Sequence, residues 1–304
     1  MTALENGVGE LSSNTSPVLE IDAFPFKGLR ISEEWKQLES VEGRTICSSC
    51  KKSRKYFCYS CYIPVSEIEH FVPKVKLPIK IDIIKHAREM DGKSTAVHAA
   101  VLAPEDVRIF TYPCIPDYSP NENVVLIFPN EKAVSVEEVC KRFTRREGEP
   151  QSKRQCTESS HQMVHRAVFI DSTWNQSRGI FKDPRVRALP SVVLKSRLSQ
   201  FWRHQAGSPR WYLATVEAIH QFLVELVTAQ GTAGLDCGNE RGDGDSTNMN
   251  HKIDTTTEVV PDDKTHKYNG QYDNLLFFFR FMYSKIHTLY DHEQLRSYKR
   301  PFIR

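Results

Sequence analysis

The chain has 304 residues, of which 39% are hydrophobic and 26% are charged, and its formal net charge is +3. At about 150 residues per domain, this length predicts one large or two modest globular domains, and the composition excludes wholesale disorder, collagen-like repeats and a disulfide miniprotein. The charge is too balanced to indicate a nucleic-acid partner by itself.

The beginning of the chain has the composition of a flexible tail. Residues 1–20 are rich in Gly, Ser, Asn and Glu without periodicity, and they lack the basic and apolar regions of a secretory signal. The longest dense apolar run, 275–279, ends at Arg280, far short of the ~20 residues of a membrane span. We therefore expect an intracellular protein without a membrane segment, whose cysteines are metal ligands or free thiols.

Two C-x-x-C pairs come next: Cys47 with Cys50, and Cys58 with Cys61, seven residues further on. Each pair can wrap a turn around one metal ion, and four thiolates satisfy tetrahedral Zn(II). The spacing predicts a structural zinc knuckle within a region bounded at 21–75, with no ligand position left open for catalysis. The alternative is four unrelated thiols.

Cations and aromatic rings stand between and beside these pairs. Lys51, Lys52, Arg54 and Lys55 lie close to several Tyr and Phe residues, a combination that suits RNA because cations meet phosphates and rings stack on bases. The alternative, equally weighted, is a solvated basic loop whose rings form the small core of the knuckle.

Beyond residue 76, short apolar runs alternate with helical patterns. We expect buried strands at 107–112, 124–128, 167–170 and 192–194 and amphipathic helices at 213–227 and 272–290. The buried stripe of the second helix is expected to comprise Leu275, Phe278, Phe279, Met282, Ile286 and Leu289. This interleaving predicts an α/β domain over 76–304 with a largely parallel sheet, interrupted by flexible polar inserts at 142–161 and 229–266.

A carboxylate follows one of the predicted strands directly. Asp171 comes just after the apolar run 167–170, and open α/β sheets bind ligands outside the carboxyl ends of their strands. Asp171 is therefore a site candidate. The alternative is that Asp171 or Thr173 only caps a helix that starts here.

Four segments in chain order match one family pattern. They are VVLIFP at 124–129, Asp171-Ser172-Thr173-Trp174, LPSVVL at 189–194 and YLATVEA at 212–218. They resemble, in turn, the strand-then-Pro element, the D-x-T-W signature, the Leu-Pro-apolar segment and the Thr-x-Glu-Ala helix start of the DTW-domain family, the tRNA-uridine aminocarboxypropyltransferases. With the cysteine cluster upstream, the resemblance covers roughly residues 45–290. The two inserts depart from the family pattern.

The resemblance implies a SPOUT-like fold, which is an α/β domain with a deep C-terminal knot that holds S-adenosylmethionine. It also implies tRNA as the partner and transfer of the 3-amino-3-carboxypropyl group of that cofactor to N3 of a uridine, with methylthioadenosine released. Because N3 carries a proton, a general base is useful there. We assign that role, or an orienting role, to Asp171.

Other residues near the signature are expected to contact the cofactor or the base: Ser172, Thr173, Trp174, Gln176, Thr215 and Glu217. Trp174 offers a face to an extruded uracil or to the sulfonium, and the helix beginning at Thr215 offers its N-terminus to the cofactor carboxylate. The alternative is that Trp174 belongs to the core and that the polar residues are ordinary caps.

Basic residues outside the cysteine cluster suggest further contacts. Arg203 and Arg210 form a phosphate track if they share a face, and otherwise a solvated surface. The paired cations at 141–142, 145–146 and 153–154 favour the nucleus over the cytoplasm. Two rival functions stay open at this point: a SPOUT-type RNA methyltransferase and a non-enzymatic zinc-ribbon RNA-binding adaptor.

Overall fold

The computed structural model describes residues 25–119, 121–144, 164–203, 208–233, 268–291 and 295–296. The predicted tail at 1–20 and most of the predicted inserts at 142–161 and 229–266 lie outside these residues. Within the described part, no helix is both long enough and apolar enough to cross a membrane.

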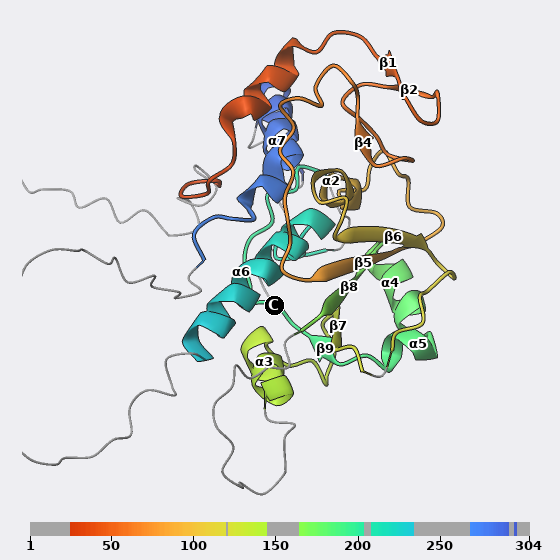
Figure 1. The fold of residues 1–304 in the computed structure, drawn as a ribbon, viewed down its shortest axis with the longest axis vertical. Helices are drawn as coiled ribbons and strands as arrows, with labels where there is room; N and C mark the ends of the chain where they lie inside the picture. The colour runs from red at the N-terminus through yellow and green to blue at the C-terminus, as the bar shows by residue number, and fades with distance from the viewer. Residues whose placement is uncertain are drawn as a thin grey trace, which may run out of the picture.

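A five-stranded parallel sheet forms the centre of the fold (Figure 1). Its strand order is β6-β5-β8-β7-β9, and the strands are β5 (Lys80–Lys85), β6 (Val107–Thr111), β7 (Val124–Ile127), β8 (Arg166–Asp171) and β9 (Ser191–Val192). The prediction of a largely parallel α/β sheet is confirmed. The four predicted strands are present within one or two residues at each end, whereas β5 was not predicted.

The order of the strands brings two distant segments together. Strand β8 is inserted between β5 and β7, although β7 precedes it in the chain. Lys85, the last residue of β5, is therefore the register partner of Asp171, the last residue of β8. Because the sheet is parallel, the carboxyl ends of all five strands meet at one edge, where ligands bind in open α/β sheets.

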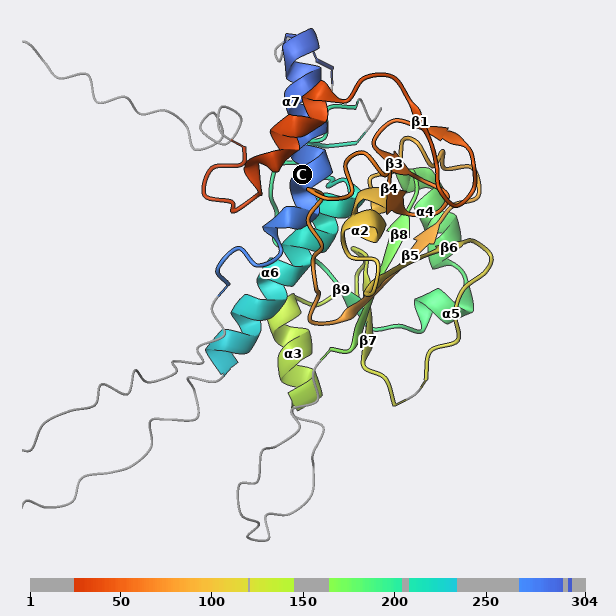
Figure 2. The same cartoon turned by 45° about the horizontal axis from the view of Figure 1, so that its top comes forward.

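Helices cover both faces of the sheet (Figures 1 and 2). One face packs against α2 (Ala96–Leu102) and α6 (Thr215–Ala233), and α3 (Val136–Thr144) lies against α6. The other face packs against α4 (Trp174–Phe181) and α5 (Pro184–Arg187). Alternate residues along each strand enter the two cores, because successive strand side chains point to opposite faces.

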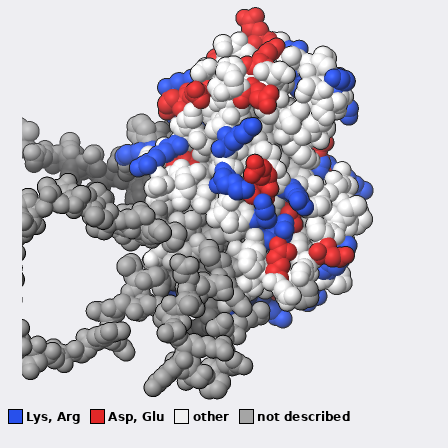
Figure 3. Space-filling model, viewed as in Figure 1, with Lys and Arg blue, Asp and Glu red and all other residues white. Residues whose placement is uncertain are grey.

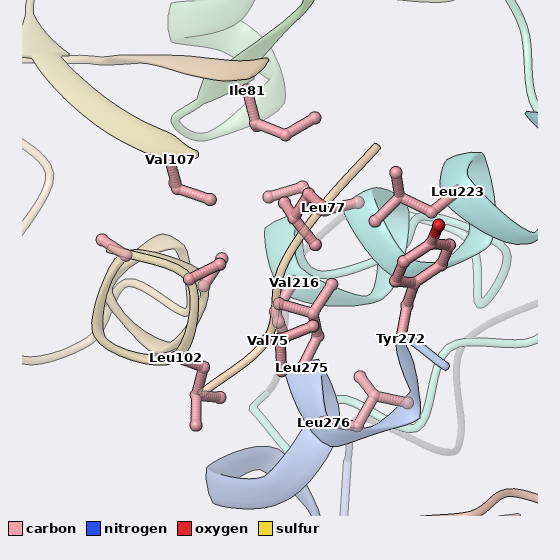
Figure 4. Close-up of a cluster of buried hydrophobic side chains, with 14 of the residues drawn as sticks. Val75, Leu77, Ile81, Leu102, Val107, Val216, Leu223, Tyr272, Leu275 and Leu276 are labelled. Carbon is pink, nitrogen blue, oxygen red and sulfur yellow. The ribbon is translucent and has the colours of Figure 1, made fainter. Parts of the chain in front are cut away.

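The larger core lies between the sheet and the helices α2 and α6. Figure 4 shows Ile81 of β5 and Val107 of β6 above Leu102 of α2, with Val216 and Leu223 of α6 beside them. All five side chains are at most 5% exposed. This packing holds the C-terminal end of α2 and the first half of α6 against the beginnings of β5 and β6.

The predicted helix at 272–290 is present as two pieces, the 3-10 helix η2 (Asp273–Leu276) and α7 (Phe277–Leu289). Helix α7 packs along η1 (Glu33–Ser40), a second 3-10 helix near the start of the described chain (Figure 2). The prediction that Leu289 lies in the buried stripe is wrong. Its side chain is 65% exposed, because the helix extends past its packing partners at this end.

The cysteine region forms two short antiparallel hairpins. They are β1 (Thr45–Ile46) with β2 (Ser53–Arg54) and β3 (Phe57–Cys58) with β4 (Ile63–Pro64). The residues that follow the two pairs, Lys51 and Tyr62, both have φ 57, the left-handed conformation that tight turns require. The two turns repeat one geometry. Ring contacts of Phe57 with Phe278 join the region to the core that also contains the sheet.

Candidate functional site

Asp171 is the point at which three parts of the chain meet. Its side chain is 5% exposed. The Ser94 hydroxyl donates to Oδ2 and the Thr215 hydroxyl donates to Oδ1, each across 2.6 Å. Its backbone carbonyl also accepts from the His86 N–H at 3.0 Å. Asp171 thus joins the end of β8 to the loop before α2 and to the start of α6.

The surroundings of Asp171 act on its pKa in opposite directions. Burial raises the pKa of Asp171, while the hydroxyls of Ser94 and Thr215 and the ammonium of Lys85 oppose that rise. The net direction is upward. A carboxyl group with a raised pKa, held by two fixed donors, is suited to exchanging a proton with a substrate.

The loop between β5 and α2 contributes site residues that the sequence analysis missed. It contains Glu89, Asp91 and Ser94, and Lys85 stands at its beginning. The Lys85 ammonium forms an ion pair with Asp91. Burial raises the pKa of Glu89, and the negative charge of Asp171 adds to the rise. A polar loop directly after the apolar pair Ile83-Ile84 is the signal that points to these residues.

The residues after Asp171 begin helix α4. The Thr173 N–H donates to Oε1 of Gln176 at 3.2 Å, and the Thr173 side chain completes a capping box. The Ser172 hydroxyl donates to the carbonyl oxygen of Thr173 at 3.2 Å. The observed contacts of Thr173 and Gln176 are therefore those of a helix cap. This cap fixes the direction in which the backbone continues after Asp171.

Trp174 is half-buried and belongs to an aromatic cluster. Its ring centroid lies 3.9 Å from that of Tyr212, with an interplanar angle of 34°, and 6.3 Å from that of Phe128. Since Tyr212 comes just before α6, this contact ties the start of α4 to the segment that leads to Thr215. The face of Trp174 that meets Tyr212 is covered by that ring.

Glu217 lies inside the protein, with no exposed surface. Its carboxylate accepts from the Ser199 hydroxyl at 2.6 Å and from the backbone N–H groups of Gln200 and Ala214, both at 2.8 Å. These donors come from the chain itself. Glu217 therefore caps its own helix and holds the segment at 199–200 against α6.

The four predicted cysteine ligands lie together at the two hairpin turns. The Sγ atoms of Cys47, Cys50, Cys58 and Cys61 all lie within 4.8 Å of one another, so they can hold a metal ion. The backbone N–H of Lys52 lowers the pKa of Cys50, but burial and the neighbouring thiols outweigh it and raise that pKa to about 11. Four thiols at this separation match the ligand set of a tetrahedral metal site.

Arg54 is part of the cysteine site and not of the protein surface. The side chain is 5% exposed, and its Nε donates to the Cys58 Sγ at 3.4 Å. Burial raises the pKa of Cys58, but donation from the Ser60 N–H and the Arg54 guanidinium brings it down to about 6. A buried guanidinium that donates to a sulfur is poorly placed to reach a phosphate, so the structure lends no support to the prediction that Arg54 contacts RNA.

The other predicted RNA contacts have different surroundings. Lys51 and Lys52 are exposed and Lys55 is half-buried. Arg203 is half-buried and donates to the carbonyl oxygen of Lys93 at 2.9 Å, at the edge of the loop that carries Ser94. Arg210 is 1% exposed, so the structure lends no support to its prediction as a phosphate contact.

Positive charge does not form one continuous area on the face shown in Figure 3. Lys and Arg side chains alternate there with Asp and Glu. This distribution agrees with the net charge of +3, and it directs attention to local contacts near the cysteine site and Asp171.

Tyr62, which follows the second cysteine pair, is influenced by charges from both the cysteine site and the Asp171 site. Burial raises the pKa of Tyr62, and the negative charges of Asp91, Asp171 and Cys58 raise it further. The Tyr62 hydroxyl therefore lies within electrostatic reach of both sites. An ideal Cβ on Gly92 lies 3.7 Å from the ring of Tyr59, so the second hairpin also packs against the loop that carries Asp91.

Comparison with known proteins gives one consistent family. Residues 55–287 match the DTW domain. The chain is 37% identical over 306 residues to tRNA-uridine aminocarboxypropyltransferase 1 of Mus musculus, covering 92% of this chain and 89% of the relative. It is 39% identical over 279 residues to the Homo sapiens protein of the same name, covering 84% and 81%. No solved structure matches this chain.

Proposed function

The chain belongs to the DTW-domain family, and from that premise we propose that it is a tRNA-uridine aminocarboxypropyltransferase. The observation that carries the proposal is Asp171. It is the first residue of the D-x-T-W segment, and it stands buried at the carboxyl end of a central strand with a hydroxyl donor on each oxygen. That position is where an open α/β sheet binds its ligands.

We assign the chemistry to the chain's own residues as follows. Asp171 accepts the proton of uridine N3, and the hydroxyls of Ser94 and Thr215 hold its carboxylate in one orientation. When bound, S-adenosylmethionine supplies an electrophilic carbon beside its sulfonium and departs as methylthioadenosine. The N3–carbon bond forms as the carbon–sulfur bond breaks, and the electron pair of the broken bond goes to sulfur.

The uracil is best placed beside the aromatic pair of Trp174 and Tyr212. Both rings are half-buried, and they belong to the segments that directly follow Asp171 and directly precede Thr215. A base that leaves its stack needs such a surface. Replacement of Trp174 by Ala is expected to raise KM for tRNA more than replacement by Phe.

The decisive assay uses purified protein, an unmodified tRNA transcript and S-adenosylmethionine labelled in the aminocarboxypropyl group. Mass analysis of the digested nucleosides is expected to find the labelled group on uridine, and Asp171→Ala is expected to abolish the product while the protein stays folded. A methylated nucleoside would establish the rival methyltransferase. Binding of tRNA without any product would favour the adaptor function.

We propose that the cysteine site binds structural Zn(II). The four thiols fill all the ligand positions of a tetrahedral metal, so no position is left open. Two tight turns hold the thiols in place, and the Arg54 guanidinium donates to Cys58. Elemental analysis is expected to find one zinc per chain. Cys47→Ser is expected to release zinc and to lower the melting temperature, whereas Cys114→Ser, at an exposed cysteine, is expected to do neither.

For tRNA we assign the contacts to Lys51, Lys52 and Lys55 on the hairpins and to Arg203 beside the Ser94 loop. Their exposure supports the assignment of Lys51 and Lys52, and the contact of Arg203 with the carbonyl oxygen of Lys93 places that guanidinium beside the Ser94 loop. Each phosphate contact that is lost reduces the slope of log affinity against log salt by about 0.7 to 0.9. The Lys51→Ala and Lys52→Ala double variant tests the assignment.

Two further features of the family complete the proposal. We infer a SPOUT-type knot in the C-terminal half, and the crossover that inserts β8 between β5 and β7 supports it.

We also propose a nuclear location from the basic pairs. Of these, Lys141 and Arg142 are exposed on α3, and the pairs at 145–146 and 153–154 lie outside the described residues. A fluorescent fusion with all three pairs changed to Ala tests the location.

A further inference from the structure

A lysine occupies the position next to Asp171 in the sheet. Lys85 ends β5 and is in register with Asp171 at the end of the neighbouring strand β8. Register partners in a parallel pair point to the same face. For this pair it is the face that carries Ile83 and Phe169 and packs against α2 and α6. The Lys85 ammonium also lowers the pKa of Asp171, so their charges interact.

Lys85 is buried, and among the described residues it forms one ion pair, with Asp91. Its side chain is 11% exposed and pairs with Asp91, whose side chain is 38% exposed. Lys80 provides a contrast at the other end of the same strand. There the lysine is 48% exposed and the aspartate partner, Asp106, is the buried member. Burying an ammonium is costly unless it is paired. Here the buried lysine depends on an aspartate that is itself partly exposed, so the inward placement of Lys85 needs an explanation.

The ion pair offers the two opposite charges that a small zwitterion needs. Asp91 stands on a loop at the carboxyl edge of the sheet, half exposed, while Lys85 lies below it and beside Asp171. A ligand with an ammonium and a carboxylate on one carbon can replace the single internal pair by two pairs of its own. Charge-assisted hydrogen bonds of this kind are short and strong.

We propose that Lys85 and Asp91 bind the amino-acid end of the group to be transferred, with Lys85 taking the α-carboxylate and Asp91 the α-ammonium. This inference rests on the proposed function, because that group is an α-amino acid. Neither residue belongs to the D-x-T-W segment, and both come from the strand and loop that sequence patterns did not reveal.

This placement explains how one carbon beside the sulfonium is selected over another. When Lys85 holds the amino-acid end, the carbon chain of the aminocarboxypropyl group is fixed as well. Its transferable carbon then lies on the face of the sheet that carries Asp171. The methyl group has no charged end and gains nothing from this pair. Positioning of this kind is a recognised source of rate and selectivity.

The test compares two ligands that differ only in the amino-acid arm. S-adenosylhomocysteine carries the arm and methylthioadenosine does not, and calorimetry gives the Kd of each. Lys85→Met is expected to weaken the binding of S-adenosylhomocysteine by roughly 10- to 100-fold, which corresponds to the loss of one hydrogen bond to a charged group. The affinity for methylthioadenosine is expected to change by less than about twofold. Asp91→Asn is expected to show the same selective loss, and Lys85→Arg to restore most of the affinity.

Lys80→Met is the matched control, since it removes a paired lysine from the same strand at the opposite edge. It is expected to leave both affinities unchanged. The assignment would be overturned if Lys85→Met and Asp91→Asn lost equal affinity for both ligands. Unchanged affinity for S-adenosylhomocysteine would also overturn it. If Lys85→Met does not fold, the half-exposed Asp91→Asn decides alone. Wild-type protein that binds neither ligand would instead overturn the proposed function, and this inference with it.

Discussion

Thr215 donates its hydroxyl hydrogen to Asp171 across 2.6 Å, although 44 residues separate them in the chain. Thr215 is the first residue of α6 and Asp171 the last residue of β8. The orientation of the carboxylate therefore depends on how α6 docks against the sheet. Any change that shifts this helix also alters the ionisation of the residue assigned as the base.

Thr215→Val removes the donor and keeps the shape. The hydrogen bond from Thr215 lowers the pKa of Asp171, so its loss is expected to raise that pKa further. Because the base must be ionised, the acid limb of the pH profile of kcat/KM should move to higher pH. Thr228→Val, at an exposed threonine of the same helix, is the control. An unchanged acid limb would exclude Asp171 as the titrating base.

Arg54→Met tests the guanidinium that contacts Cys58. Residues that support metal ligands without binding the metal typically change its affinity by 10- to 100-fold, and we expect a loss of that size for zinc in a competition with a chromophoric chelator. Arg44→Met is the matched control, since Arg44 is on the same hairpin and donates to Ser53. Equal zinc affinity of both variants would contradict the assigned role.

Asp106→Asn tests a buried carboxylate outside the site. Burial raises the pKa of Asp106, but the Lys80 ammonium and the Leu77 N–H donate to it and lower it below its ordinary value of 3.8. A lowered acid pKa stabilises the fold above that ordinary value, and this stabilisation is lost as the pH falls through the folded-state pKa. We expect urea unfolding at pH 7 to show a loss of roughly 1.5–3 kcal/mol for Asp106→Asn. The difference from wild type should narrow near pH 3.

Phe278→Ala tests the contact between the cysteine hairpins and α7. Phe278 has no exposed surface, and its ring centroid is 4.7 Å from that of Phe57. Truncation of such a ring typically costs about 3–5 kcal/mol of unfolding free energy. Leu289→Ala on the same helix is expected to change it by less than about 0.5 kcal/mol, because that side chain is already exposed. Comparable losses for both variants would contradict this packing.

Local patterns predicted the parts of the site that local forces determine. The segment around 167–170 is apolar because β8 is buried on both faces, and Asp171 directly follows it, so its place at the sheet edge could be inferred. The cysteine spacing was equally informative, because metal ligands in a turn need a fixed separation. Both features depend on residues that are neighbours in the chain.

The rest depends on partners far away in the sequence. Strand β5 was missed because Asp82 interrupts its apolar run, and Asp82 is tolerated inside only because Arg166 of β8 pairs with it at 2.9 Å. Arg54 and Arg210 looked like surface cations, yet both are buried. Ser94 lies 77 residues from Asp171, and no pattern in either segment predicts the hydrogen bond between them.

The first described segment of the chain and the segment that contains η2 and α7 hold each other in place. The Arg30 N–H donates to the Asp273 carboxylate at 2.6 Å across 243 positions of sequence, and Phe26 packs edge-on against Tyr283. During synthesis, the N-terminal segment and the cysteine hairpins emerge long before α7 exists to cover them. Their final docking must wait until α7 has also left the ribosome. Chains shortened before α7 are therefore expected to be targets for chaperones and proteases, even when they retain Asp171 and all four cysteines of the metal site.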